Sequence, residues 1–229
     1  MYITQKPPTL LTVSLLLVST LLNFSCAGLQ PQRSQGPAYS GIVPEAPPER
    51  PIPEIPLHIL GEGQVPPGTL SRFLLVINSN AEEEFVAELT QFYAEEAEDE
   101  GVNHDVAFAQ MCLETGFLRY GNLVTPDMNN FCGLGAIGPG QNGEHFDTPR
   151  TGVQAHIQHL KAYATDAPLN KDLVDPRYRW VRYGTAPTIY GLAGTWATDK
   201  EYAEKIKSIL EELYQFTYSG KMDSNREVL

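Results

Sequence analysis

A short apolar segment that ends on a carboxylate is the first feature of this 229-residue chain that could carry chemistry. Residues 104–116 are typical of a helix in which Gln110 is the only polar side chain between positions 106 and 113, so this helix belongs in a core. Glu114 precedes Gly116, a typical helix stop, by two residues. Apolar surroundings and the negative end of a helix both disfavour a charged carboxylate, so we expect the pKa of Glu114 to be raised. A raised pKa suits a general acid, although a Glu at a helix end can also simply face water.

A second carboxylate would complete a site for cleaving glycosidic bonds. Such cleavage needs a protonated acid at the leaving oxygen and another carboxylate that acts on water or on the sugar. Glu144 and Asp147 lie on a glycine-rich stretch about thirty residues after Glu114 and are the candidates. The alternative is that both are ordinary loop acids, with Asp147 capping a helix near Thr148. The later loops also hold aromatic residues that could stack on sugar rings, although most should be core: Phe117, Tyr120, Trp180, Tyr183, Tyr190, Trp196 and Tyr202.

Other catalytic patterns have less support. The glycines between residues 133 and 138 follow no predicted strand and open no helix, so a dinucleotide fingerprint fails on context. His145, His156 and His159 form no zinc motif, and we expect the last two to be helix-surface histidines rather than metal ligands. No serine lies in a nucleophile elbow, and nothing near Cys112 or Cys132 would lower a thiol pKa. We therefore expect no metal and no organic cofactor.

Charge excludes one class of partner. The net charge of −12 offers no basic patch to neutralise phosphates, which argues against nucleic-acid binding. It also disfavours a general attraction to anionic lipid headgroups. A polyanionic partner would therefore have to be held by local contacts in a cleft.

The N-terminus has the pattern of a secretory signal, predicted over residues 1–26. Lys6 precedes an apolar run over residues 10–22, which is short for a membrane-spanning helix. Ser25-Cys26 resembles the end of a bacterial lipobox, which predicts a lipid anchor on Cys26; plain secretion is the alternative. Either way the mature chain is expected to work outside the cytoplasm, in the periplasm or at the cell surface.

Residues 27–68 are predicted to form a proline-rich tether. Ten of the eighteen prolines lie between residues 30 and 67, a composition typical of extended, semi-rigid polyproline. Such a segment builds no core but can hold a domain away from a membrane.

The two cysteines of the mature chain leave two possibilities equally open. In an oxidising compartment Cys112 and Cys132 can form a disulfide. They can equally be buried free thiols that behave as small apolar residues.

The folded domain is expected over residues 69–220, followed by a flexible tail over residues 221–229. Capping signals and periodicity predict four helices, near residues 80–100, 103–115, 148–165 and 198–216. The apolar run over residues 73–77 fits either a strand or a helical turn. The acidic positions Glu95, Glu96, Glu98 and Glu100 are interpreted as a solvated face. The sequence thus predicts a mainly α single domain with long loops between its helices.

Four stretches resemble a known family, the bacterial glucosaminidases of glycoside hydrolase family 73. Ala107-Phe-Ala-Gln-Met-Cys-Leu-Glu-Thr-Gly116 is similar to the family's A-Q-A-x-L-E-S-G helix, and Asn129-Asn-Phe-Cys-Gly-Leu134 to its N-N-L-F-G-I loop. Residues 146–155 look like the family's next segment, which begins the helix after this loop. Residues 196–206 are similar to Y-A-T-D-P-x-Y-A-x-K-I, with Trp196 and Lys200 in place of Tyr and Pro. The four motifs occur in the right order.

The resemblance implies a lysozyme-like, α-rich domain with a short loop-rich or β lobe over a cleft. It implies an endo-β-N-acetylglucosaminidase that hydrolyses β-1,4 bonds after N-acetylglucosamine in peptidoglycan, with Glu114 as the general acid. Glu144 best matches the family's second acidic residue. Tyr202, which corresponds to a tyrosine that lines the family's cleft, is expected to be the third catalytic residue. The expected substrate-binding residues are Asn129, Asn130, Phe131, Gly133, Trp196 and Asp147. The alternatives are a lytic transglycosylase of the same superfamily and a catalytically inactive cell-wall-binding module.

Overall fold

The computed structural model describes residues 51–121, 123–138 and 140–219. The chain divides into two units, residues 1–46 and 47–229, and all described residues belong to the second. The predicted signal peptide, with Cys26, and the predicted tail lie outside the described residues. Within the part that is described, no helix is long and apolar enough to cross a membrane.

The helix α3 (His104–Thr115) lies at the centre of this unit, as its apolar sequence predicted. Nine of its twelve residues are buried. The side chain of Asn103 accepts hydrogen bonds from the amides of Asp105 and Val106, and Gly116 ends the helix with a φ of 57°. Both predicted ends of the helix are therefore confirmed, and Glu114 lies in its last turn.

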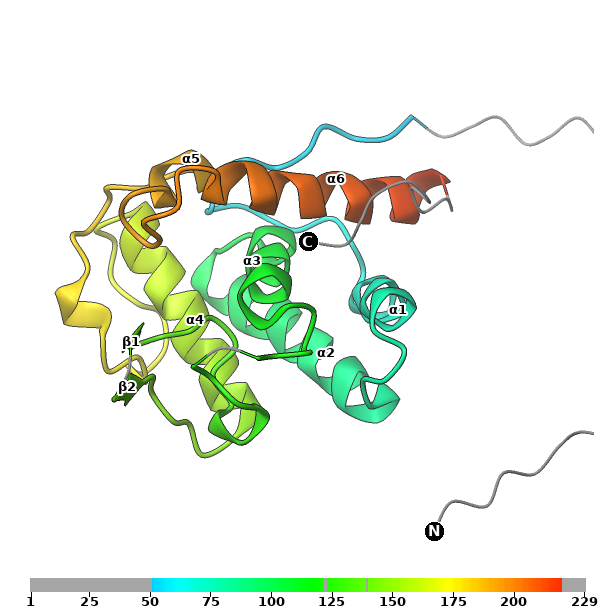
Figure 1. Ribbon diagram of the computed structural model, residues 1–229. Coiled ribbons are helices and arrows are strands. Elements are labelled where there is room, and N and C mark those ends of the chain that lie inside the picture. The colour runs from blue at the N-terminus through cyan, green and yellow to red at the C-terminus, as the bar shows by residue number, and fades with distance from the viewer. Residues whose placement is uncertain (1–50, 122, 139, 220–229) are drawn as a thin grey trace, which may run out of the picture. The chain divides into compact units, whose positions relative to one another are not determined.

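Among the described residues, four longer helices pack around α3 and a short one, α5, lies against α6: α1 (Pro67–Ile77), α2 (Glu83–Glu100), α4 (Pro149–Ala164), α5 (Ile189–Leu192) and α6 (Tyr202–Ser219). α6 lies across α3, while α2 contacts both α1 and α4 (Figure 1). The ambiguous run over residues 73–77 is helical, because it forms the end of α1. α2 begins later than predicted, because Glu82 rather than Asn80 caps it by accepting hydrogen bonds from two backbone amides. The mainly α prediction is confirmed.

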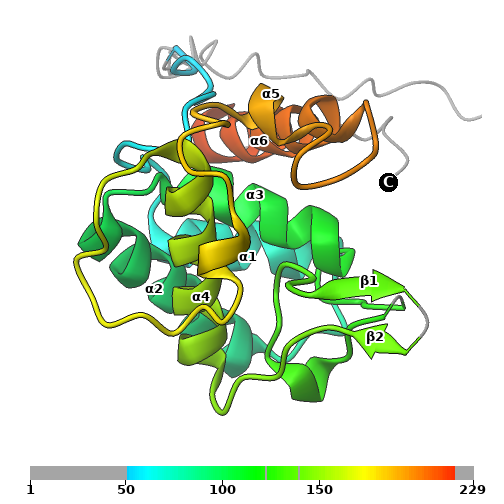
Figure 2. The same ribbon diagram turned by 90° about the vertical axis from the view of Figure 1, so that its left-hand side faces the viewer.

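A small lobe between α3 and α4 holds the strands that the structure describes. It contains the 3-10 helix η1 (Pro126–Met128) and the antiparallel strands β1 (Ala136–Gly138) and β2 (Gln141–Asn142). Strands of three and two residues are too short to show an alternating pattern of apolar and polar side chains, so they cannot be predicted from the sequence alone. A second 3-10 helix, η2 (Tyr178–Trp180), packs against α4 (Figure 2).

Part of the segment assigned to the tether is packed into the domain. Ile59 and Val65 are buried, and backbone bridges join His58 to Thr188 and Leu60 to Val102. The folded unit therefore starts before Thr69, and the predicted boundary at residue 68 lies too far along the chain. Isolated apolar residues among prolines carry no periodic signal, so the sequence did not reveal this packing.

The predicted solvated acidic face of α2 is wrong at two positions. Glu96 and Glu100, one helical turn apart, are both buried against α4 and the loop after it. Glu96 pairs with Arg150 at 2.7 Å and with Lys171 at 2.6 Å, and Glu100 pairs with the buried Lys161 at 2.7 Å. Cations distant in sequence thus allow these carboxylates to be buried.

Candidate active site

Glu114 is half-buried in the last turn of α3. This end of α3 lies between the hairpin lobe and the connection from α5 to α6 (Figure 2). Its Oε1 accepts a hydrogen bond from Trp196 Nε1 at 3.1 Å and another from the hydroxyl of Tyr202. Burial, the largest effect, raises the pKa of Glu114, while the hydrogen bonds from Tyr202 and Trp196 oppose the shift by favouring the carboxylate. The predicted direction of the shift is confirmed.

The two oxygens of Glu114 have different surroundings. Both donors reach Oε1, whereas Oε2 faces Gly133, where an added Cβ would lie 3.5 Å away. Gly133 has a φ of +68°, a conformation that side chains disfavour. Gly133 belongs to a segment of residues 132–136, here called the glycine loop. Because Oε1 already accepts two hydrogen bonds, a proton on Glu114 is best placed on Oε2, at the edge of this loop.

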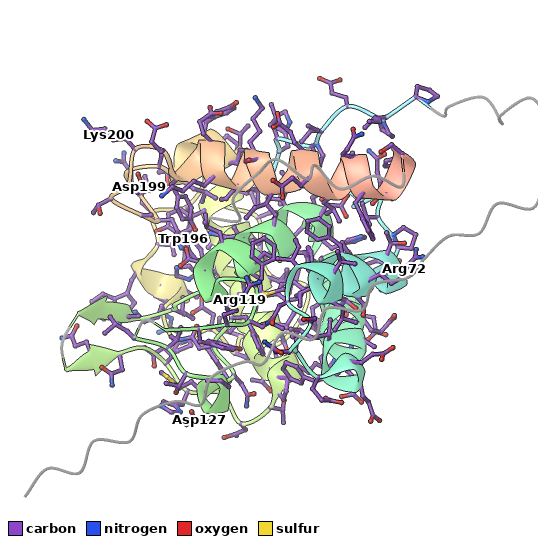
Figure 3. All side chains as sticks on the ribbon, turned by 45° about the vertical axis from the view of Figure 1, so that its right-hand side comes forward. Arg72, Arg119, Asp127, Trp196, Asp199 and Lys200 are labelled. Atoms are coloured by element: carbon purple, nitrogen blue, oxygen red, sulfur yellow. The ribbon has the colours of Figure 1, made fainter. Side chains whose placement is uncertain are left out.

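Tyr202 and Trp196 are themselves held firmly. The hydroxyl of Tyr202 accepts a hydrogen bond from Gln110 Nε2 at 2.8 Å. Burial and the neighbouring Glu114 raise the pKa of Tyr202 well above its ordinary value, so its hydroxyl stays protonated and can donate. The indole of Trp196 packs against His159 and Tyr163, with ring centroids 5.1 and 5.5 Å away, in the connection that precedes α6 (Figure 3).

The side chain of Asn130 organises the glycine loop. Its Oδ1 accepts from the amide of Leu134 at 2.9 Å, and its Nδ2 donates to the carbonyls of Leu134 and Glu144 at 2.9 and 3.0 Å. Gly143 leaves room for this amide, because a Cβ there would lie 3.0 Å from Asn130 Nδ2. The buried Asn130 therefore ties the start of the lobe to its end.

Glu144 lies across the glycine loop from Glu114, next to another glycine of that loop. A Cβ at Gly135 would lie 3.0 Å from Glu144 Oε1, two positions along from Gly133. Arg177 Nη1 lies 3.7 Å from the same Oε1, and both side chains are about one-third exposed, at 30% and 33%. The two carboxylates thus flank one short loop segment.

A cavity of about 260 Å³ opens beside this loop. Residues 132–136 line one side, and Trp196, Tyr163, Arg177 and Trp180 line the other. Trp180 is 79% exposed, and the guanidinium of Arg177 lies 5.2 Å from its ring centroid. The cavity therefore offers aromatic faces and a cation next to the residues that contact Glu114.

Residues 90–215 match the glucosaminidase family, described as mannosyl-glycoprotein endo-beta-N-acetylglucosaminidase. The chain belongs to this family. The matched range contains Glu114, Glu144, Trp196 and Tyr202, and membership makes the protein a glycoside hydrolase. The family resemblance inferred from the four motifs is thereby confirmed.

This glucosaminidase-family chain is also similar to individual proteins. An uncharacterized protein of Borreliella burgdorferi is 40% identical over 163 residues, which cover 71% of this chain and 80% of that protein. The crystal structure of S. aureus autolysin E in complex with the muropeptide NAM-L-Ala-D-iGlu is 16% identical. The match covers 76% of this chain and 79% of that one, with a TM-score of 0.46.

The structure brings some of the expected site residues together and separates others. Glu114, Tyr202, Trp196 and Gly133 are in one cluster, with Glu144 across the glycine loop. Phe131, Asn129 and Asp147 have other surroundings. Phe131 is buried against Phe85, Asn129 Nδ2 donates to the carbonyl of Phe146 at 2.9 Å, and Asp147 is exposed just before α4.

His156 and His159 are buried on α4, which contradicts the prediction of two surface histidines. His156 Nε2 lies 3.0 Å from Gln110 Oε1, and His159 Nδ1 lies 2.7 Å from Asp175 Oδ2. Their i, i+3 spacing was the available signal, since it places both on one helix face. That face is internal because Trp196 and residues of α2 and α3 cover it.

Cys112 and Cys132 are both free and buried, which decides between the two possibilities that the sequence left open. Burial raises the pKa of each thiol well above its ordinary value, so neither is a reactive thiolate. Among the described residues, no cluster of three or more His, Cys, Asp or Glu could hold a metal ion.

Proposed function

We propose that this glycoside hydrolase cleaves β-1,4 bonds after N-acetylglucosamine in peptidoglycan, with Glu114 as the general acid. The observation that carries the proposal is the environment of Glu114, where burial raises the pKa while two donors hold Oε1. A carboxyl group that keeps its proton to a higher pH can donate it to the leaving oxygen near neutrality. The family match and the four bacterial glucosaminidase motifs support the choice of bond and polymer.

In this proposal the proton leaves from Oε2 of Glu114, on the side of Gly133. Once the proton has gone, Trp196 and Tyr202 stabilise the new carboxylate through hydrogen bonds that already exist. Because these donors are packed in place, little reorganisation accompanies the proton transfer.

The reaction at the sugar carbon can be assisted by one of two groups. Glu144, held near Arg177 across the glycine loop, acts on water or on the sugar. The alternative is that the acetamido group of the substrate itself takes this role. In either case Trp180 and Trp196 supply aromatic faces for sugar rings in the cavity. Asn129, Asn130 and Phe131 then act by shaping the lobe, and Asp147 contacts substrate only where the glycan passes the start of α4.

The proposed site of action is outside the cytoplasm. The pattern over residues 1–26 supports export, and the lipobox-like Cys26 supports a lipid anchor. Metabolic labelling with a fatty acid, compared between the full-length chain and Cys26→Ala, tests the anchor; an unlabelled wild type would rule it out.

Digestion of purified peptidoglycan followed by mass spectrometry tests the activity. We expect reducing N-acetylglucosamine ends from the wild type and a loss of at least about 100-fold in rate for Glu114→Gln. Glu88→Gln, the same change at an exposed position on α2, serves as the control and should digest normally.

Two results would replace the proposal. Anhydro-muramic ends would identify a lytic transglycosylase. A folded wild type that binds peptidoglycan without cleaving it would identify a wall-binding module.

A further inference from the structure

We propose that Tyr93, His156 and Gln110 form a buried positioning relay that fixes the hydroxyl proton of Tyr202 on Glu114. This inference rests on the proposed function, because the relay affects catalysis only through the general acid Glu114. It joins four helices, with Tyr93 on α2, Gln110 and Glu114 on α3, His156 on α4 and Tyr202 on α6.

The contacts form an unbroken chain. Tyr93 Oη lies 2.9 Å from His156 Nδ1, and His156 Nε2 lies 3.0 Å from Gln110 Oε1. Gln110 Nε2 lies 2.8 Å from Tyr202 Oη, and the hydroxyl of Tyr202 contacts Glu114 Oε1. The side chains of Tyr93, Gln110 and His156 are completely buried, at 0% exposure, so water does not compete for these hydrogen bonds.

The donors and acceptors of these groups allow only one direction of donation along this series of hydrogen bonds. Gln110 donates through Nε2 to Tyr202, so its Oε1 is an acceptor and His156 must donate from Nε2. A neutral imidazole then accepts at Nδ1, and the hydroxyl of Tyr93 donates there. Since the oxygen of Tyr202 is occupied by Gln110, its own proton is directed to Glu114.

His156 remains neutral, as this direction requires. Burial, and secondarily His159 on the same helix, lowers the pKa of His156 to about 3. The groups that face it from the other elements are Tyr93 on α2, Gln110 on α3 and the indole of Trp196. None of these carries a charge at neutral pH.

The relay acts on Glu114 by favouring its ionised form. The other groups that face Glu114 are Trp196, which donates to Oε1, and the free, buried Cys132, which also lies near Tyr93 and Tyr202. A polarised, fixed hydroxyl on Tyr202 strengthens the bond to the carboxylate that remains after proton donation. Weakening the relay should therefore raise the pKa of Glu114 and lower kcat.

Carbon-13 NMR of the Glu114 carboxyl, assigned by comparison with Glu114→Gln, measures this pKa without requiring activity. We expect a higher pKa in Gln110→Met, which keeps the side-chain length but removes the amide, and in His156→Leu. His156→Gln, which keeps an N–H able to reach Gln110, should restore the pKa towards that of the wild type. Thr90→Val is the matched control. It changes a buried side chain on α2 and removes a part-buried hydrogen bond outside the relay, from Thr90 Oγ1 to the carbonyl of Ala87 at 3.0 Å.

Kinetics on peptidoglycan supply a second readout. Loss of one fixed hydrogen bond should lower kcat about fivefold to tenfold and move the alkaline limb of the pH profile upward, with little change in KM. If the relay had a purely structural role, the relay variants and Thr90→Val would all lose stability. The pKa of Glu114 and the alkaline limb of the pH profile would then stay unchanged, and that result would overturn the proposal.

Nitrogen-15 NMR of His156 in the wild type tests the relay even if the variants fold poorly. A protonated Nε2 and a bare Nδ1 support it, and the opposite tautomer overturns it. A wild type that does not cleave peptidoglycan, but whose relay variants still shift the Glu114 pKa, would refute the proposed function while leaving the relay intact.

Discussion

At the scale of single residues, Glu114 shows how burial at the end of a helix raises the pKa of a carboxyl group. Oε1 is anchored by Trp196 and Tyr202, and Oε2 is left at the glycine loop. The apolar sequence of α3 allowed the raised pKa to be predicted, since burial is its main cause. The identity of the two donors depends on residues about eighty to ninety positions later, which no local pattern reveals.

Glu114→Gln is expected to stabilise the protein at neutral pH. Folding raises the pKa of Glu114 above its ordinary value of 4.5, so the folded state binds this proton more tightly than the unfolded state. That stabilisation is complete below about pH 4.5 and is lost as the pH rises through the folded-state pKa. Each unit of pKa difference corresponds to about 1.4 kcal/mol, and a neutral glutamine avoids the loss.

Urea unfolding of both proteins between pH 4 and pH 8 measures this effect. The free-energy difference in favour of Glu114→Gln should grow with pH and level off once Glu114 is ionised. A difference that is constant across the range would show that the carboxyl titrates alike in the folded and unfolded states.

At the scale of elements, buried ion pairs join α2 to α4 and the loop after it. Glu100 accepts from Lys161 Nζ at 2.7 Å and from the amides of Asn170 and Lys171 at 2.9 and 3.1 Å. The lysine and the carboxylate are 6% and 0% exposed, so neither charge has water as an alternative partner.

Lys161→Met should destabilise the protein by about 3 to 5 kcal/mol, because it leaves the charge of Glu100 buried without its cation. The double variant Glu100→Gln with Lys161→Met should recover most of this loss, since the amide oxygen can still accept from the two backbone amides. Thermal or urea unfolding of the wild type and the two variants gives the comparison. Equal losses in the single and double variants would show that the ion pair contributes through packing alone.

Helix positions were the part of the fold most accessible from the sequence. Asn103 and Gly116 marked the ends of α3, and Thr148 marked the start of α4 by accepting from the amide of Thr151. These signals act within one turn, so they can be recognised locally. The burial of Glu96 could not be recognised from its local sequence, because its partners Arg150 and Lys171 lie 54 and 75 positions away.

The candidate site shows the same division between local and distant information. Glu114 was found from its own helix. Trp196 and Tyr202 were named among several aromatic candidates for sugar stacking, but their place in the cleft, like that of Gly133, was indicated only by resemblance to a family. The burial of His156 was missed because its i, i+3 spacing with His159 fits an exposed face as well as a buried one. Only the packing of Trp196 and Tyr93 around it distinguishes the two.

At the scale of the whole molecule, Asp105 joins the start of the folded unit to its centre and to its last helix. Its carboxylate accepts from the amides of Gln64 and Val65 at 2.8 and 3.2 Å and from the hydroxyl of Tyr214 at 2.8 Å. Asp105 is completely buried at the first turn of α3. The segment before α1 is therefore secured to the helix that carries Glu114.

Asp105→Ala should lower the free energy of unfolding by about 3 kcal/mol or more, because three hydrogen bonds to a buried charge are lost. Hydrogen exchange should speed up first at the amides of Gln64 and Val65. Asp166→Ala, at an exposed position, serves as the control and should change neither quantity. Unaltered exchange at residues 64 and 65 would show that the backbone bridges alone hold this segment.

The bridges that fix residues 58 and 60 also have a mechanical consequence. A pull along the chain from residue 51 would reach the domain first at the pairs His58–Thr188 and Leu60–Val102, ahead of α1. Force would thus be carried into α3 and the segment before α5 rather than unwinding a helix from its end. In an enzyme anchored by its N-terminus, as proposed above, these two bridges would bear the tension, at the opposite end of α3 from Glu114.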